Sequence, residues 1–266
     1  MELRKYQSDD LVRYWDTKEP IEIPSSYTFR ENEVRGIWVS NVANIDTPKG
    51  LPVEEYQAYL KQMIKNIADF KLNTIIFQVR PNSDAYYESK LNPWSRYITG
   101  VEGKNPGFDV LAFVIAEAKK YGIKVHAWMN PYRVQASGSK DLSRIIKKYK
   151  NYPQNPASSA DNLLVNNAGG VILNPCLESV RQFIVDTVME VMENYDIDAI
   201  HFDDYFYISD VDDDSYYNTL NPDGLGKSDW RREQVNMFIK KLSEEMRAYN
   251  KKNNRYVQLG ISPTGI

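Results

Sequence analysis

Two adjacent aspartates, Asp203 and Asp204, follow a short apolar run and are the residues best suited to carry chemistry. Side chains alternate along a strand, so His201 and Asp203 are expected on one side of this run and Asp204 on the other. Glycoside hydrolysis requires a pair of carboxyl groups, one to donate a proton and one to act as nucleophile or base. The sequence therefore nominates Asp203 and Asp204 as catalytic. The alternative for Asp204 is a structural role, in which it caps the following loop or pairs with an arginine.

A second apolar run ends with polar groups of a different kind. Gln78 and Arg80 share one side of it, and Asp84 follows shortly after. The Arg80 guanidinium could hold a carboxylate or bind an anionic or hydroxylated substrate. Its structural alternative is a salt bridge to Asp203 or Asp84.

Two more runs complete the set of candidate substrate contacts. Trp128 and Asn130 share one side of a third run, and Asn41 follows the first. An aromatic face can pack on the apolar face of a sugar ring, although a tryptophan in a strand is more often part of the core. These positions are typical of a carbohydrate cleft.

Metal chemistry has weaker support. His126, His201 and Asp203 could together hold a metal ion, but the chain has no HxH or HxxxH spacing. The alternating aspartates of 210–214 resemble the start of a calcium loop, yet they lack its glycine and its closing glutamate. Cys176 is the single cysteine, so no internal disulfide can form. We expect no metal and no cofactor.

The composition excludes several classes of protein. The 266 residues contain 33 basic and 36 acidic side chains, a net charge of -3, which argues against a nucleic-acid binder. No apolar run approaches the roughly 18 residues that a membrane span needs. The first ten residues are polar, so we expect no signal peptide in this chain.

Apolar periodicity predicts an alternation of strands and helices after an N-terminal arm or extension, residues 1–34. The stretch 135–173 reads as a polar insertion with one short helix, and Asn174 as the N-cap of the helix that follows. Strands are predicted at 36–42, 73–80, 124–130, 198–203 and 256–262, and helices at 53–70, 109–121, 177–195 and 229–249.

This alternation predicts an α/β fold with a parallel sheet over residues 35–266. The first strand–helix turn has no glycine-rich phosphate loop, which weakens a dinucleotide-binding fold. Functional groups at the carboxyl ends of several strands are typical of the (β/α)8 TIM barrel. About five strand–helix units are present, so the predicted domain is a barrel truncated after about five strands.

Five ordered motifs carry a resemblance to a known family. The chain resembles the glycosyl-hydrolase-like family 10 domain over about residues 34–266. The motifs are Val34–Val39 (VRGIWV), Ile76–Asp84 (IFQVRPNSD), His126–Arg133 (HAWMNPYR), Asn174–Pro175 and Ile200–Tyr207 (IHFDDYFY).

The resemblance implies a (β/α)8 barrel of bacterial, often exported or lipid-anchored proteins, similar to glycosidases that cut peptidoglycan strands stripped of their peptides. It implies a nucleophile-like position for Asp203, with Arg80, Asn130 and His201 around it. The family domain continues through further strands beyond Ser262, so the second catalytic acid is Asp204, Asp84 or a residue outside this chain. The same rim would add Tyr132, Arg133 and Tyr205 to the substrate contacts.

We therefore expect a glycoside hydrolase that acts on a cell-wall glycan or a related polysaccharide and works outside the cytoplasm. The first alternative is a carbohydrate-binding barrel without a competent acid pair. The second is a metal-dependent hydrolase. A second carboxyl group about 5–10 Å from Asp203 would favour the hydrolase over the binding barrel.

Overall fold

The computed structural model describes every residue except 6, 27, 29, 31–32 and 264–266. Contacts between residues divide the chain into two units, Met1–Val34 and Arg35–Ile266. In the smaller unit, which covers the predicted N-terminal arm or extension, antiparallel bridges fold the segment back on itself. These bridges join Glu2 to Glu22, Arg4 to Leu11 and Arg13 to Pro20.

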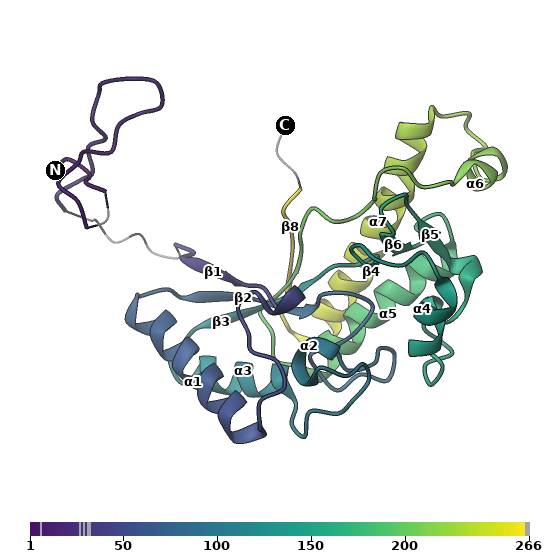
Figure 1. Ribbon diagram of the computed structural model, residues 1–266, viewed down its shortest axis with the longest axis horizontal. Coiled ribbons are helices and arrows are strands. Elements are labelled where there is room, and N and C mark those ends of the chain that lie inside the picture. The colour runs from purple at the N-terminus through teal and green to yellow at the C-terminus, as the bar shows by residue number, and fades with distance from the viewer. Residues whose placement is uncertain (6, 27, 29, 31–32, 264–266) are drawn as a thin grey trace. The chain divides into compact units, whose positions relative to one another are not determined.

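A parallel sheet forms the centre of the larger unit (Figure 1), and its strands lie side by side in chain order. Within the described residues five strands form this sheet, and a helix lies between each pair of consecutive strands. The strands are β1 (Gly36–Val39), β2 (Thr74–Arg80), β3 (Lys124–Met129), β7 (Ala199–Phe202) and β8 (Gln258–Ile261). The helices are α1 (Val53–Asp69), α2 (Arg96–Thr99), α3 (Val110–Lys119), α4 (Leu142–Lys148), α5 (Glu178–Asn194), α6 (Asp214–Thr219) and α7 (Lys227–Asn253).

This order confirms the predicted α/β class. A barrel keeps its strands in chain order, whereas a doubly wound sheet reverses direction part-way. The sheet is that of an open (β/α) barrel: β1 pairs with β2, β8 pairs with β7, and neither has a second partner among the described residues.

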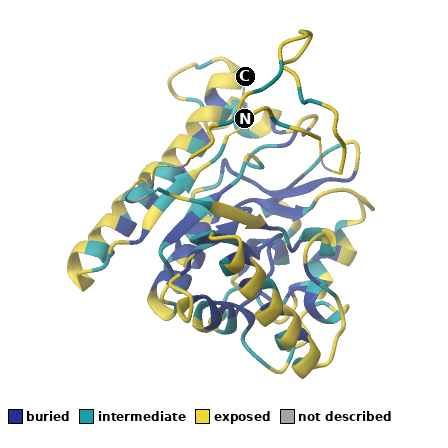
Figure 2. Cartoon of the chain, turned by 90° about the vertical axis from the view of Figure 1, so that its left-hand side faces the viewer, coloured by how far each residue is buried: buried dark blue, intermediate teal, exposed yellow. Residues whose placement is uncertain are grey.

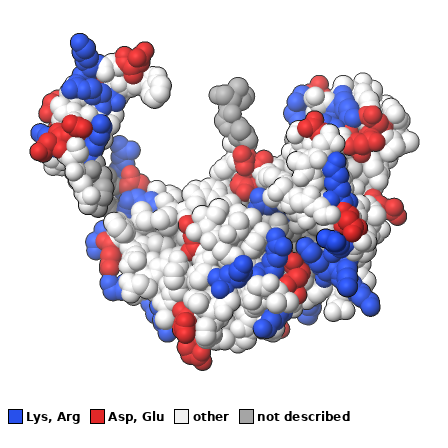
Figure 3. Space-filling view, viewed as in Figure 1, with Lys and Arg blue, Asp and Glu red and all other residues white. Residues whose placement is uncertain are grey.

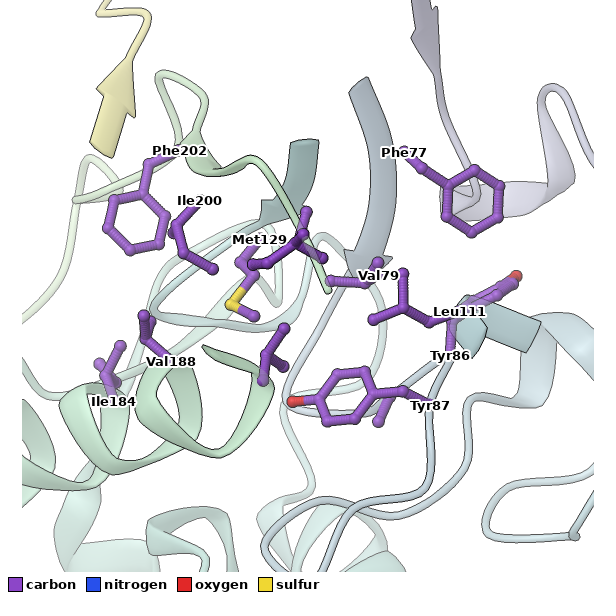
Figure 4. Close-up of a cluster of buried hydrophobic side chains, with 14 of the residues drawn as sticks. Phe77, Val79, Tyr86, Tyr87, Leu111, Met129, Ile184, Val188, Ile200 and Phe202 are labelled. Carbon is purple, nitrogen blue, oxygen red and sulfur yellow. The ribbon is translucent and has the colours of Figure 1, made fainter. Parts of the chain in front are cut away.

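The core lies between the sheet and its helices (Figure 4). Ile75, Phe77 and Val79 alternate along β2 and are fully buried, as a strand covered on that face requires. Helices α1 and α5 bury one stripe each and expose the other side. Figure 2 shows buried and exposed residues side by side on the helices around the sheet. Fully burying one such side chain stabilises the fold by about 1.5–3 kcal/mol.

Residues 135–173 contain the predicted short helix, α4, but outside it they are not the predicted polar insertion. They contribute most of a small antiparallel sheet, in which the central strand β6 (Val171–Leu173) pairs with β4 (Arg133–Gln135) and β5 (Leu163–Val165). The short 3-10 helices η2 (Pro156–Ser158) and η3 (Ala160–Asn162) precede β5. The sequence prediction was wrong here because strands of three residues are too short to show a period.

A smaller prediction was also wrong. Asn174 is not a helix cap, because α5 begins at Glu178 after Leu177; the Asn174 side chain instead accepts a hydrogen bond from the backbone N–H of Cys176. Phe70 follows the last residue of α1, and its ring is exposed. In the part of the chain that the structure describes, no helix is long and apolar enough to cross a membrane.

Candidate active site

Asp203 follows β7 directly, and neighbouring side chains fix the orientation of its carboxylate. The indole Nε1 of Trp128 donates to Oδ2 at 3.1 Å, and the Nδ2 of Asn130 donates to the same oxygen at 2.5 Å. The other oxygen accepts from the backbone N–H of Tyr205 at 3.0 Å. Trp128 lies beside His201 in the register of β3 and β7, so the end of β3 reaches the residue that follows β7. Residues of two strands therefore hold one half-buried carboxylate in a fixed orientation at the carboxyl ends of the parallel strands.

Behind this carboxylate, buried amides link the ends of three strands. The Oδ1 of Asn130 accepts from the Nε2 of Gln78 at 2.7 Å and from the guanidinium of Arg133 at 2.5 Å. The Oε1 of Gln78 accepts in turn from the backbone N–H of Asn41 at 2.8 Å. Asn41, Gln78 and Asn130 are all 0% exposed. Their predicted contact with substrate is corrected: they bond to one another and position the rim.

Arg80 and Asp84 are buried beneath the rim and do not face it. The Arg80 guanidinium donates to the backbone carbonyls of Asn130 and Pro131, at 2.7 and 3.0 Å, and to Ser83 at 2.9 Å. Burial lowers the pKa of Arg80 and raises the pKa of Asp84. With each residue 1% exposed, neither can touch a substrate, and Asp84 cannot serve as the second catalytic acid. These predictions were wrong because the segment after β3 and Ser83 bind the Arg80 guanidinium beneath the rim, while the Asp84 carboxylate accepts a hydrogen bond from the backbone N–H of Asn82.

Tyr132 and Arg133 differ in position although they are adjacent in sequence. Tyr132 is 0% exposed and packs against Phe238 of α7, with ring centroids 5.6 Å apart, so its predicted substrate contact was wrong. Arg133 is largely buried, but its guanidinium stacks over the half-buried ring of Tyr205 at 4.8 Å. Arg133 and Tyr205 therefore lie together beside Asp203.

An aromatic cluster covers the sheet face below Asp203. The ring of Trp38 meets Trp128 and His201 edge to face, with centroids 4.8 and 4.7 Å away. Trp128 is 9% exposed and its indole N–H is bound to Asp203, whereas Trp38 is 40% exposed. The accessible aromatic face thus belongs to Trp38. The sequence signal was present, since Trp38 and Ser40 share one side of the first strand.

His201 is half-buried and contacts residues of the last strand and the segment after it. Its Nε2 lies 2.9 Å from the hydroxyl of Ser262, and a Cβ on Gly260 would come within 2.7 Å of its Nδ1. Burial, followed by the nearby His126, lowers the pKa of His201. Among the described residues no three His, Cys, Asp or Glu side chains are grouped as a metal site would need.

The acidic segment 203–214, which follows β7, has one aspartate with a structural role, Asp213. Asp204 is exposed. Asp213 has a fully buried side chain and accepts hydrogen bonds from Arg231 at 2.6 Å and from Tyr207 at 2.6 Å. These bonds connect the segment to α7.

Burial raises the pKa of the Cys176 thiol to about 11, which makes it an unreactive thiol at neutral pH.

Comparison with known proteins agrees with the resemblance seen in the sequence. Glycosyl hydrolase YngK of Bacillus subtilis (strain 168) is 35% identical over 244 residues, which cover 89% of this chain and 46% of that protein. Glycosyl hydrolase DigH of Escherichia coli (strain K12) is 32% identical over 259 residues, covering 91% of this chain and 58% of that protein. The chain therefore spans about half the length of these relatives.

Among solved structures, the galactosidase domain of the α-galactosidase-sucrose kinase AgaSK is similar with a TM-score of 0.49 and 14% identity, covering 87% of this chain and 27% of that one. The family model described as Glycosyl hydrolase-like 10 matches residues 33–266. On this match and on its relatives, the chain belongs to the glycosyl hydrolase-like 10 family.

Proposed function

We propose that the chain is the catalytic part of a glycoside hydrolase that cuts peptidoglycan glycan strands lacking peptides, outside the cytoplasm and without a cofactor. The observation that carries this proposal is the Asp203 carboxylate, oriented by Trp128 and Asn130 at the carboxyl edge of a parallel sheet. Active sites of (β/α) barrels lie at this edge. The names of the relatives YngK and DigH, both glycosyl hydrolases, support the reaction class.

The chemistry follows from where charge develops. Breaking a glycosidic bond creates an oxocarbenium-like centre, and a fixed carboxylate lowers its energy by attacking the anomeric carbon or by stabilising its charge. Asp203 takes this role. A second carboxyl group protonates the leaving oxygen, and Asp204 or a residue outside this chain supplies it. The exposed face of Trp38 suits a sugar ring bound across the rim.

The burial of Asp84 favours one alternative, because it removes a candidate proton donor. That alternative is a carbohydrate-binding barrel that holds a glycan without cutting it. Both functions use the same rim, so a binding measurement alone does not separate them.

The test is digestion of purified glycan strands, freed of peptides, by this chain and by Asp203→Asn, with new reducing ends counted. We expect the parent to release fragments and the variant to be slower by about 10²–10⁴-fold. Circular dichroism and melting establish that the variant is folded. Binding of the strands by the parent without any release of fragments would establish the binding barrel and reject the hydrolase.

A further inference from the structure

A hollow of about 220 Å³ lies at the same edge of the sheet as Asp203. Segments that follow three neighbouring strands line it: Val42 after β1, Asn82 after β2 and Gln135 after β3. Parallel strands place their carboxyl ends at one edge, which is why these distant segments converge. The backbone at this point holds an uncommon shape, with Ala43 at φ 54°.

The lining of the hollow carries fixed charge. Arg96 enters from α2, with its guanidinium 5.2 Å from the ring centroid of Tyr97, and Lys148 enters from α4. The Nζ of Lys148 lies 3.7 Å from the carboxylate of Glu102, which also lines the hollow. Figure 3 shows Lys and Arg side chains gathered over α4 and the loops beside α2. Two cations therefore face a single carboxyl group among the described lining residues.

Glu102 only partly offsets these cations. Burial, and then the negative charge of Asp84 beneath it, raises the pKa of Glu102 to about 7. Near neutral pH the carboxyl group is protonated part of the time, and it can then donate a hydrogen bond. Arg96 and Lys148 leave the hollow with an excess of positive charge, which suits an anionic group on a ligand.

The hollow also adjoins the candidate active site. Val42 follows Asn41, and Val134 of its lining follows Arg133. Arg133 bonds to Asn130, and Asn130 bonds to Asp203. The lining of the hollow is thus connected, through the chain and through these bonds, to the residues that hold Asp203.

We propose that this hollow is a subsite for a carboxylate carried on a sugar ring, held by Arg96 and Lys148. The proposal rests on the proposed glycosidase function and names the residues that recognise a carboxylate on its substrate. A guanidinium can take a carboxylate through two parallel hydrogen bonds, and an ammonium adds a point charge. Two sugars supply this group: a muramic acid whose lactyl carboxyl bears no peptide, and a uronic acid. Attachment of a peptide converts the lactyl carboxylate into a neutral amide, so the subsite prefers peptide-free strands.

The test measures binding by calorimetry at one ionic strength, with Asp203→Asn used to prevent turnover. The ligands are peptide-free muramic-acid oligosaccharides, the same oligosaccharides with the carboxyl converted to an amide, and oligomers that contain glucuronate. We expect the amide form to bind at least about tenfold more weakly than the carboxylate form. Tighter binding of muramic oligomers than of glucuronate oligomers would assign the lactyl group, and the reverse would assign a uronic acid.

Variants test whether Arg96 and Lys148 cause the preference for the carboxylate form over the amide form. Adding Arg96→Gln and Lys148→Gln should lower affinity for the carboxylate form to that of the amide form and leave the amide form unchanged. Lys147→Gln, an exposed cation on the same helix but outside the hollow, is the matched control. Glu102→Gln removes the competing charge and should keep or tighten binding of the carboxylate form, which also guards against loss of binding through misfolding.

Each failure has its own signature. Equal affinity of the folded protein for carboxylate and amide forms would overturn the subsite, whether or not the parent cuts either of them. A preference for the carboxylate form that persists in the double variant would also overturn the subsite, because residues other than Arg96 and Lys148 would then recognise the carboxylate. Selective binding that depends on Arg96 and Lys148, with no cleavage of any strand by the parent, would support the subsite and reject the hydrolase.

Discussion

The indole Nε1 of Trp128 and the carboxylate of Asp203 lie 3.1 Å apart, and this hydrogen bond joins the ends of β3 and β7. The bond uses the polar atom of a side chain whose rings are otherwise packed against Trp38. Trp128 is therefore a positioning residue for Asp203, in addition to forming part of the aromatic cluster.

Trp128→Phe should lower kcat by about tenfold or more and leave KM nearly unchanged. The variant keeps an aromatic ring but removes one donor to a charged acceptor, a bond that contributes about 1.5–3 kcal/mol. Steady-state kinetics on soluble glycan oligomers measures this. Trp230→Phe is the control, because Trp230 donates to the carbonyl of Leu220 away from the rim. An equal fall in kcat for both variants would contradict a positioning role.

Trp38→Ala should raise the Kd for glycan oligomers by about three- to tenfold, the effect of losing one aromatic contact of 0.5–1.5 kcal/mol. Trp38 is the accessible ring of the cluster, so its loss removes a surface for a sugar. Fluorescence or calorimetric titration gives the affinity. The exposed Trp15, in the smaller unit, provides the matched substitution and should leave the affinity unchanged. Unchanged affinity in Trp38→Ala would remove this face from the binding surface.

Tyr132→Ala should destabilise the fold by about 3–5 kcal/mol, because it leaves a large cavity against Phe238. Tyr132→Phe should be neutral or slightly stabilising, since the buried hydroxyl has no hydrogen-bond partner among the described residues. Urea denaturation measures both. A stable Tyr132→Ala protein with weakened glycan binding would instead place this ring at the rim.

Glu102 should make stability fall as pH rises from about 5 to about 8. The folded chain holds this proton up to about pH 7, whereas the unfolded chain releases it near the ordinary value of 4.5. Unfolding in that window therefore releases a proton, and higher pH favours the unfolded chain. After allowance for partial exposure and for Lys148, the effect is on the order of 1 kcal/mol.

Denaturation of Glu102→Gln at several pH values measures the contribution of this group. We expect the variant to lose less stability than the parent across the window. Glu244→Gln, at an exposed position on α7, is the control and should behave as the parent does. Parallel pH profiles for the parent and Glu102→Gln would contradict the assignment.

The open sheet should make the chain self-associate. The outer edges of β1 and β8 have no strand partner among the described residues. An apolar hollow of about 410 Å³ is lined in part by Ile37 of β1, and one of about 860 Å³ in part by Ile261 of β8. Unpaired edges are templates for another chain. Sedimentation should show an average mass that rises with concentration and falls in Ile261→Lys. Val101→Lys, at an exposed loop position away from β1 and β8, is the control. A monodisperse monomer at all concentrations would contradict this.

The main elements could be predicted because their signals are long. Helix α1 repeats apolar residues over 17 positions, and the seven residues of β2 are rich in β-branched and aromatic side chains, so these patterns identify them. The strands β4, β5 and β6 have three residues each and give no such signal. Their pairing depends on contacts between distant parts of the chain, which a local pattern does not contain.

Strand patterns place the candidate residues at one end of the sheet but do not show how deeply each side chain is buried. Alternation along a strand shows that Trp128 and Asn130 share a side, and strand direction shows which edge they reach. It does not show how far a loop folds over a side chain. For that reason Arg80 was expected at the surface, although three loop and backbone partners enclose it. The bond between Trp128 and Asp203 depends on the register of β3 and β7, which the sequence of either strand alone does not specify.

Gly260 has a consequence for variation along β8. Any side chain at this position would begin 2.7 Å from the Nδ1 of His201, and the neighbouring backbone of β8 is fixed by its pairing with β7. Even alanine must displace the imidazole, and with it the contact to Ser262. A library that randomises β8 and selects for folded, active protein should therefore return glycine at 260 while it tolerates many residues at the exposed Gln258.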